Sequence, residues 1–453
     1  MRRGRWVAAV LFVALASLTA LAGCGGSGDA GPIRIGVLFD CLPPLDGVQE
    51  SAVAAVEAPF LRDGAEPAGA QPSSGLRGAE VGGHPVEISV GCPQINQYAR
   101  IIEETRRLIE DEGAQVIVGT VGATEGTVLR RVAARYPDVT FVLAMSWASS
   151  PTFRDPADNV FRFGPTAAQS AAGLGTYAYR ELGWRTAAVL ADEYPTGWEG
   201  AAAFEEEFCA LGGRVVVRDF ASLLPLLSGK PDPAAIAAAR AADGLVVLST
   251  VGVIAPISVD PFVTRYAAGR GDLAQRVLLG GPAFELAPNL TWHVPSAGVV
   301  VASARPPGGA AASRELTAAV AGAFPALAAT PLSQAVTDWY GTAADAVSRA
   351  LADADGDLSD GQAAFRTSLA SQRFDAPLGP MRLDGSRQAV VTTYLGRVGG
   401  PPDAPTVGPF EEAPDVDQTL DGLLREVPQR AEPACARHAA PAWSDAVSPR
   451  SSR

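Results

Sequence analysis

Residues 114–150 read AQVIVGTVGATEGTVLRRVAARYPDVTFVLAMSWASS, and this stretch decides the fold of the chain. It holds two short apolar runs, residues 116–118 and 140–144, each long enough for a buried parallel strand. Residues 125–135 lie between them, have the length of a helix and carry apolar side chains at helical spacing. This strand–helix–strand pattern predicts an α/β fold with a parallel sheet.

Small and polar residues follow both predicted strands of this unit. Ligands of parallel α/β sheets bind at the carboxyl ends of the strands, so we expect two neighbouring loops to form a binding edge. The alternatives are a plain strand-to-helix turn for the first loop and a packed core tryptophan for Trp147. The candidate residues are Thr120, Gly122 and Thr124 in the first loop, and Ser146, Trp147 and Ser149 in the second.

Strands and helices alternate over most of the remaining chain, in two successive runs. This alternation predicts two doubly wound, Rossmann-like lobes. Residues 167–182 are predicted to form one helix, and the proline-rich residues after Gly399 an irregular tail. We assign residues 33–161 and 298–380 to the first lobe (N-lobe), 162–297 and 381–410 to the second (C-lobe), and 411–453 to a C-terminal tail.

The N-terminus has the organisation of an export signal. Three arginines precede an apolar run, residues 6–22, that is too short for a stable membrane span. The run ends in the sequence LAGC at Cys24, which resembles the bacterial lipobox, in which the cysteine is lipidated. We expect residues 1–23 to be a lipoprotein signal peptide and residues 24–32 a flexible tether. The alternative is an ordinary secretory peptide with an incidental cysteine.

The charge of the chain argues against nucleic acid as a partner. The net charge is −13 at pH 7, and removal of the leader, which holds three arginines and no acidic residue, makes it −16. Such a surface repels nucleic acid, and the sequence has no basic stripe that would reverse this.

Four cysteines follow Cys24, and an even number in an exported chain favours disulfides. Three pairings are possible. Cys41 and Cys92 each follow a predicted strand of the first lobe, which favours a Cys41–Cys92 bond. Cys209 and Cys435 are then left to pair with each other.

The sequence offers no pattern for catalysis or for a metal. It has no G-x-S-x-G elbow, no H-E-x-x-H and no Walker loop. The acidic run at residues 353–360 places its glycine at the wrong position for an EF-hand loop and lacks the final glutamate. We therefore predict a protein that is not an enzyme and has no cofactor and no metal.

Several segments together resemble the leucine/isoleucine/valine-binding family of ABC-transporter substrate-binding lipoproteins, which has the type I periplasmic binding fold. They are LIEDEGAQVIVG at residues 108–119, VFRF at 160–163, VLAD at 189–192, WYGTAADAV at 339–347 and PLGPMRLD at 377–384. The resemblance implies two lobes joined by three crossings, which close on a small solute and deliver it to a membrane permease.

The resemblance also implies ligand contacts, of which some are absent here. The serine that helps to hold the ligand's α-carboxylate aligns with Ala123, next to Thr124, and the threonine of the next loop aligns with Ser149. Backbone N–H groups of the first loop can still bind an anion, so both loops are expected to hold an anionic group. The acidic partner of the ligand's α-ammonium falls near Ala283, so this charge is either absent or supplied by Glu285.

The matching edge of the second lobe is expected at residues 192–198. Asp192 or Glu193 could pair with a ligand cation, and Tyr194 or Trp198 could stack on a ring or a cation. The alternative is that these acids favour the N-terminus of a helix through its dipole.

These observations predict a monomeric, lipid-anchored solute receptor on the outer face of the bacterial cytoplasmic membrane. Its partners would be a small polar, amino-acid-like ligand in the interlobe cleft, an ABC permease, and the membrane through its lipid. The alternative is a lipoprotein sensor that reports its ligand to a membrane partner.

Overall fold

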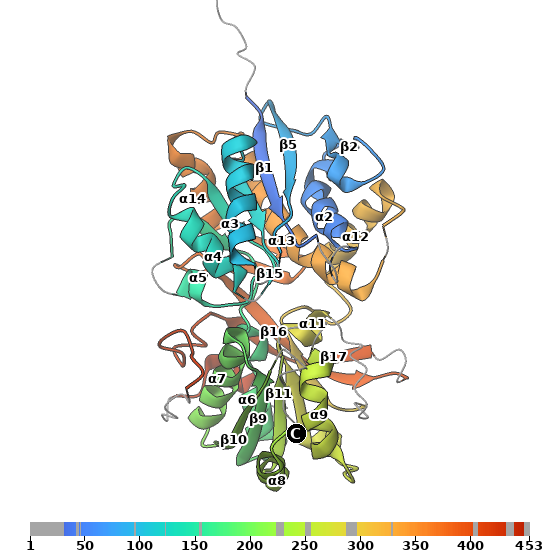
Figure 1. Ribbon diagram of the computed structural model, residues 1–453, viewed down its shortest axis with the longest axis vertical. Coiled ribbons are helices and arrows are strands. Elements are labelled where there is room, and N and C mark those ends of the chain that lie inside the picture. The colour runs from blue at the N-terminus through green and yellow to red at the C-terminus, as the bar shows by residue number, and fades with distance from the viewer. Residues whose placement is uncertain are drawn as a thin grey trace, which may run out of the picture.

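Two α/β lobes lie one above the other along the long axis of the computed structural model (Figure 1). The predicted fold class, with two doubly wound lobes, is confirmed. The structure describes residues 31–41, 45, 47–94, 97–122, 124–153, 156–222, 231–249, 255–286, 297–327, 329–401, 406–431 and 439–447. The predicted signal peptide, Cys24 and nearly all of the tether lie outside these residues.

The N-lobe is built on a six-stranded sheet of order β4-β5-β1-β6-β7-β8. Its strands are parallel except for β4, which pairs antiparallel with β5. Their side chains are mostly apolar and buried, as expected for a sheet covered on both faces. The strands are β1 (Ile33–Leu38), β4 (Glu80–Val81), β5 (His84–Gly91), β6 (Val116–Gly119), β7 (Thr140–Leu143) and β8 (Val160–Arg162).

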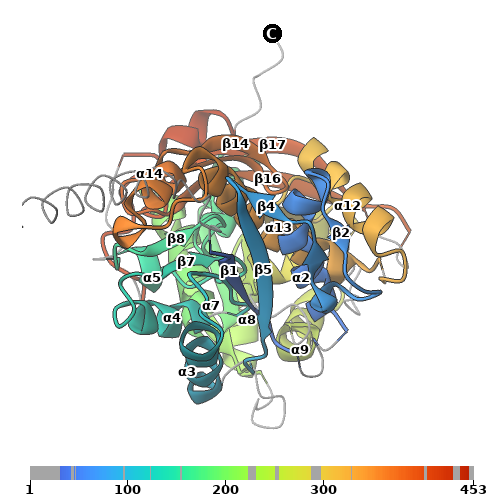
Figure 2. The ribbon, with the colours of Figure 1, turned by 90° about the horizontal axis from the view of Figure 1, so that it is seen from above.

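Helices cover both faces of this sheet. Figure 2 shows α2, α12 and α13 on one side of β1 and β5, and α3, α4 and α5 on the other. A small antiparallel pair, β2 (Glu66–Pro67) and β3 (Leu76–Arg77), follows α2 and flanks the short helix η1 (Pro72–Ser74). The helices are α2 (Gln49–Arg62), α3 (Tyr98–Arg106) with its π-helical extension η2 (Arg107–Asp111), α4 (Glu125–Ala133), α5 (Ser150–Phe153), α12 (Ala311–Ala323), α13 (Pro331–Asp353), η5 (Asp360–Gln362) and α14 (Ala363–Ser371).

The C-lobe is built on a nine-stranded mixed sheet of order β10-β9-β11-β12-β13-β16-β15-β14, with β17 also paired to β16. The β14–β15 end of this sheet reaches the N-lobe, where it packs against α12, α13 and α14. Strands β9 to β13 are parallel, and β14 to β17 form antiparallel pairs. The strands are β9 (Thr186–Asp192), β10 (Arg214–Ala221), β11 (Gly244–Leu248), β12 (Val277–Gly280), β13 (Val300–Ser303), β14 (Arg373–Ala376), β15 (Gly379–Leu383), β16 (Ala389–Gly399) and β17 (Thr406–Val416).

The helices of the C-lobe are shorter on average than those of the N-lobe. The longest of them, α7 (Pro195–Ala210), packs beside β9 and β10 (Figure 1). The others are α6 (Leu174–Thr176) between η3 (Gln169–Ala171) and η4 (Tyr177–Glu181), α8 (Pro233–Ala241), α9 (Ala255–Ala267), α10 (Leu273–Arg276), α11 (Pro282–Leu286) and η6 (Ala442–Asp445).

Strand β13 belongs to the C-lobe sheet, although residues 298–303 were expected in the first lobe. Val300 and Val301 lie opposite Leu278 and Leu279 of β12, and β16 pairs along the other edge of the strand. All four residues of β13 are buried or nearly so. Such an apolar strand gains most where it has a neighbour on each side, and the chain therefore returns to the N-lobe only after Ser303.

The single helix predicted over residues 167–182 is broken into η3, α6 and η4. Gly173 interrupts it with φ of 86°, a left-handed conformation that favours glycine. The buried carboxylate of Glu207 accepts hydrogen bonds from the N–H groups of Gly173 and Thr176, at 2.9 and 3.2 Å. It thus satisfies the donors that the break leaves without a helical partner.

The segment predicted as an irregular tail is partly ordered against the C-lobe. β17 pairs with β16 over most of its length, and its prolines are tolerated because it lies at an edge of the sheet. Further on, Trp443 is 2% exposed, and its indole N–H donates to Glu207 Oε1 at 3.0 Å. Strand β17 could not be predicted from the sequence, because the many prolines of this segment are unusual in strands.

The predicted bond between Cys41 and Cys92 is confirmed, with a Cα–Cα distance of 5.3 Å. It joins the loop after β1 to the loop after β5, two parallel neighbours in the sheet. Cys209 in α7 also takes part in a disulfide. Its predicted partner, Cys435, lies outside the described residues.

A buried arginine fixes the crossings between the lobes. Arg162, at the end of β8, donates from Nη1 to the backbone oxygens of Ser146 and Ala148, and from Nη2 to that of Ser149. Its Nε donates to the side-chain oxygen of Gln388, which precedes β16 on a later crossing. The arginine thus joins the loop after β7 to two of the segments that connect the lobes.

Replacement of Arg162 by methionine is expected to lower the free energy of unfolding by at least about 3 kcal/mol, because several buried acceptors lose their donors at about 1–3 kcal/mol each. Urea unfolding followed by circular dichroism measures this loss. The control is Arg373→Met, an exposed residue of β14, which should change stability by less than about 0.5 kcal/mol. Equal effects of the two substitutions would contradict the role given to Arg162.

Candidate functional site

The two loops that follow β6 and β7 lie side by side, as the sequence predicts. The N–H of Gly122 donates to the backbone oxygen of Met145 at 2.9 Å, and the N–H of Trp147 donates to that of Gly122 at 3.4 Å. Gly122 and Ser146 form an isolated parallel bridge. The parallel pairing of the two strands therefore continues into the loops and holds them as one edge.

Tyr194 of the C-lobe reaches this edge. Its phenol oxygen lies 3.1 Å from Thr124 Oγ1, which in turn lies 2.9 Å from the phenol oxygen of Tyr98 at the start of α3. Burial raises the pKa of Tyr194, so the phenol is neutral over the physiological range and can donate. Thr124 is thus a point of contact between the lobes.

A carboxylate of the C-lobe binds the second loop. Glu199, on α7, accepts hydrogen bonds from the N–H of Ser149 at 3.0 and 2.9 Å to its two oxygens, and from Ser149 Oγ at 2.7 Å. Both residues are almost completely buried. Burial raises the pKa of Glu199 to about 7, although the hydrogen bonds of Ser149 and the charge of Arg162 act in the opposite direction.

A second carboxylate lies on the first loop. Glu125, the first residue of α4, is 1% exposed, and its Oε2 accepts from the N–H of Thr124 at 2.9 Å. A Cβ placed on Gly122 would lie only 2.1 Å from the same oxygen, so the carboxylate lies directly over the loop backbone. Each of the two loops that were expected to hold a ligand anion therefore carries a carboxylate of the chain itself.

Asp192 lies at the end of β9 and faces the end of β11. Both of its carboxylate oxygens are within hydrogen-bond distance of Ser249 Oγ, at 3.2 and 2.9 Å. A Cβ on Gly197 would lie 2.2 Å from the backbone oxygen of Asp192, so this glycine allows the first turn of α7 to approach β9. The acid is buried and shared between two strand ends.

Trp147 is packed in the protein interior. It is 4% exposed, and its ring meets Trp339 of α13 edge to face, with centroids 5.9 Å apart. Within the described part of the chain, no hydrogen-bond partner exists for the indole N–H groups of Trp147 and Trp198 or for Ser146 Oγ. Buried donors of this kind are costly when unpaired, and a polar solute can supply the missing acceptor.

The remaining predicted residues add little to the site. Thr120 is buried, and its hydroxyl makes only a long contact of 3.4 Å to the backbone oxygen of Val121. Ala123 lies outside the described residues, and Glu285 falls in α11 with its side chain outside them. In the part of the chain that the structure describes, no group of His, Cys, Asp and Glu could hold a metal ion.

Sequence reasoning missed Glu199, Glu125 and Arg162. Glu199 directly follows Trp198 in α7 and precedes a run of small residues, Gly200 and three alanines. An acid beside such a run on a predicted cleft edge is a usable signal. An arginine inside the apolar segment VFRF is another, because a buried guanidinium needs several acceptors.

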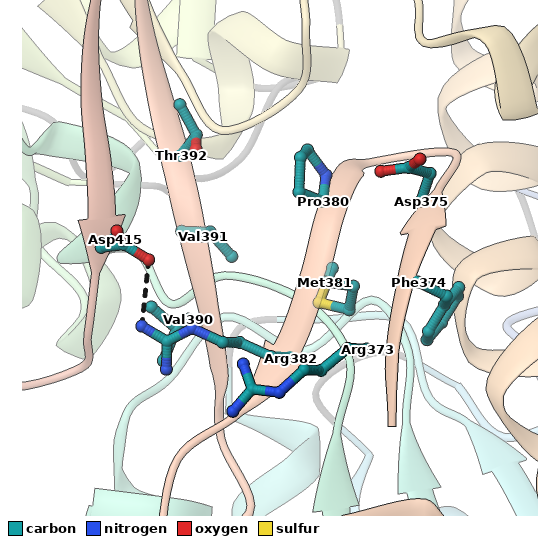
Figure 3. Close-up of a pocket in the computed structure, with 10 residues that line it drawn as sticks. All are labelled: Arg373, Phe374, Asp375, Pro380, Met381, Arg382, Val390, Val391, Thr392 and Asp415. Atoms are coloured by element: carbon teal, nitrogen blue, oxygen red, sulfur yellow. Dashed lines mark hydrogen bonds and ion pairs between the residues drawn. The ribbon is translucent and has the colours of Figure 1, made fainter. Parts of the chain in front are cut away.

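A separate cavity lies beside the strands near the crossings. It has a volume of about 380 Å³ and is lined by residues of β14, β15, β16 and β17 (Figure 3). Arg382 and Asp415 form an ion pair of 3.0 Å at its wall. None of the predicted site residues lines it.

A family model described as periplasmic binding protein matches residues 32–401. The chain belongs to this family. No curated protein matches it in sequence. None of the described helices is long and apolar enough to cross a membrane.

Solved structures of substrate-binding proteins share the fold at low sequence identity. An ABC transporter substrate-binding protein from Sphaerobacter thermophilus is 23% identical, with a TM-score of 0.69 over 85% of this chain and 99% of that one. A solute-binding protein from R. palustris in complex with 4-hydroxybenzoate is 17% identical, with a TM-score of 0.68 over 88% and 100%. LivJ from Streptococcus pneumoniae in complex with isoleucine is 14% identical, with a TM-score of 0.60 over 84% and 100%.

The raised pKa of Glu199 predicts a pH dependence of stability. The folded state holds a proton on Glu199 up to a pH of about 7, whereas the unfolded chain releases it near 4.5. The folded state therefore binds more protons between these values, and the free energy of unfolding falls as the pH rises through this range. The loss is up to about 3 kcal/mol.

Urea unfolding at pH 5 and pH 8 tests this, with Glu199→Gln as the comparison. The drop in stability between the two pH values should be smaller in Glu199→Gln, because that variant cannot titrate at this position. Glu57, whose pKa burial raises to about 8, contributes equally to both proteins and cancels. The same drop in both would mean that Glu199 does not titrate in this range.

Proposed function

We propose that the protein is an extracytoplasmic solute receptor that captures a small polar solute between its lobes and delivers it to an ABC importer. The observation that carries the proposal is the meeting of two sheet edges. The loops after β6 and β7 face the start of α7, and the pairs Thr124–Tyr194 and Ser149–Glu199 connect them. Membership of the periplasmic binding protein family supports the same role.

Closure of the lobes would couple binding to delivery. A solute that contacts both edges favours the closed arrangement over the open one by the difference in its affinity for the two. The crossings near Arg162 and Gln388 are the hinge about which the lobes would move. The importer would then recognise the closed, loaded form.

A screen of solutes against the mature chain tests the binding role. A ligand present at 100 times its Kd should add about 2.7 kcal/mol to the free energy of unfolding and raise the melting temperature. Thermal-shift measurements over amino acids, amides, aromatic acids and polyamines should therefore find at least one stabilising class. A flat response to every class would count against a receptor for small solutes.

Attachment through Cys24 is also part of the proposal, and it is supported by the lipobox-like sequence at residues 21–24. The lipid would hold the monomeric receptor on the outer face of the cytoplasmic membrane, near its permease.

Replacement of Cys24 by alanine should release the protein from the membrane fraction of expressing bacteria, because no acyl chain can then be attached. Fractionation and immunoblotting measure this, with Cys41→Ala as a control that removes a different cysteine. If Cys24→Ala stays in the membrane fraction, the anchor lies elsewhere.

A further inference from the structure

Ser149 presents the kind of group that holds a carboxylate, and a carboxylate of the chain is already there. A backbone N–H and the hydroxyl of the same residue point to one place at the end of the loop after β7. Glu199 fills that place with both of its oxygens, at 2.7 to 3.0 Å. The residue comes from the opposite lobe, so the contact spans the interface between the two sheet edges.

We propose that Glu199 takes the position of a ligand carboxylate, so that the cleft selects neutral polar solutes with an amide or hydroxyl oxygen over carboxylates. This inference rests on the proposed receptor function and specifies its solute class.

Electrostatics supports this choice. A solute carboxylate that approached Ser149 would find its donors occupied and would lie within a few ångströms of a like charge. In a buried site such a pair is strongly unfavourable, since little solvent screens it. Arg162 offers such a carboxylate no free donor, because its N–H groups bind backbone oxygens of the same loop and Gln388, and its charge already balances that of Glu199.

The loop after β6 also disfavours a solute carboxylate, for a separate reason. The N–H of Thr124, at the entrance to α4, is a donor that a ligand anion could use, and Glu125 Oε2 accepts from it at 2.9 Å. A solute carboxylate would therefore meet an internal carboxylate at either loop. Each loop therefore holds an internal carboxylate where a ligand anion would bind, and this carboxylate repels anions.

Two indole N–H groups on the segments that carry Ser149 and Glu199 could donate to a neutral oxygen of a solute. Trp147 and Trp198 each lie within two positions of the Ser149–Glu199 contact in sequence, and within the described residues their indole N–H groups have no hydrogen-bond partner. An amide or hydroxyl oxygen can accept from an indole N–H without adding charge beside Glu199. A matching neutral donor on the solute could share the oxygens of Glu199.

Matched pairs of solutes test the inference on the mature chain. The probes are benzoate with benzamide, 4-hydroxybenzoate with 4-hydroxybenzamide, and N-acetylisoleucine with N-acetylisoleucinamide. Isothermal titration calorimetry measures the Kd of each for the wild-type chain, for Glu199→Ala and for Glu199→Gln. Asp272→Asn is the control, because this partly exposed acid of the C-lobe pairs with Arg276 at 2.5 Å and precedes α10 and β12, at the opposite end of the strands from the binding edge.

The wild-type chain should bind the amide of at least one pair at least tenfold more tightly than its carboxylate. Glu199→Ala frees the N–H and hydroxyl of Ser149, so it should bind the carboxylate at least tenfold more tightly than the wild type does. Glu199→Gln removes the charge but keeps the shape, and should show a smaller gain. Asp272→Asn should match the wild type.

A pH series on the unmodified chain gives a test that does not depend on the folding of a variant. Carboxylate affinity should rise as the pH falls below about 7, where Glu199 becomes neutral, while amide affinity should stay constant. A wild-type chain that prefers carboxylates and loses them on Glu199→Ala would overturn the inference but leave the receptor intact. Failure of every probe to bind every variant would count against the receptor function itself.

Discussion

The buried guanidinium of Arg162 determines how the two lobes meet. It binds three backbone oxygens of the loop after β7 and the side chain of Gln388, so one residue orients a binding edge and ties it to a crossing. Burial lowers the pKa of Arg162 to about 10, which leaves it charged at physiological pH. The presence of this cation beside Ser149 makes it tolerable to bury the carboxylate of Glu199 from the other lobe. Arg162 therefore both positions the loop after β7 and allows a carboxylate to be buried beside it.

Helix α7 shows how an acidic chain places carboxylates inside itself. Glu199 binds the N-lobe, Glu205 pairs with Arg218 at 2.6 Å, and Glu207 accepts from Thr176 and Trp443. Each acid has its own partner, as buried charge requires. These acids are connecting elements between α7 and four separate parts of the chain, and they do not form a solvated face.

The two lobes could be predicted from local patterns in the sequence, because strands and amphipathic helices are recognisable from the spacing of their apolar residues. The stretch 114–150 gave both the strand–helix–strand unit and the adjacency of its loops, and the Cys41–Cys92 bond followed from strand order. The sheet to which β13 belongs could not be predicted, because the sequence of a buried apolar strand does not indicate which strands it pairs with.

The chemistry of the edge was harder to predict than its location. A hydroxyl and backbone N–H groups at strand ends indicate an anion site, and this remains true of Ser149 and Thr124 as isolated groups. What fills them depends on Glu199, which is 50 positions away from Ser149 in sequence, and on the way Glu125 folds back over its own loop. Contacts of these two kinds, between residues far apart in sequence or within one loop, leave no repeating pattern in the sequence from which they could be predicted.

Strand β16 has a mechanical consequence for any movement of the lobes. Residues 384–388, which connect the lobes, lead directly into this strand, and β16 is hydrogen-bonded to β13 on one side and to β17 on the other. A strand that is hydrogen-bonded along both edges resists twisting, so β16 is expected to be rigid. At this connection, any rotation would fall on the turn at Asp384–Gln388 and on the short contact of β15 with β16, which pair only at residues 382–383 and 389–390. If the lobes rotate as proposed, the bending at this connection would be confined to a few residues beside Arg162, and the C-lobe sheet would keep β17 with it.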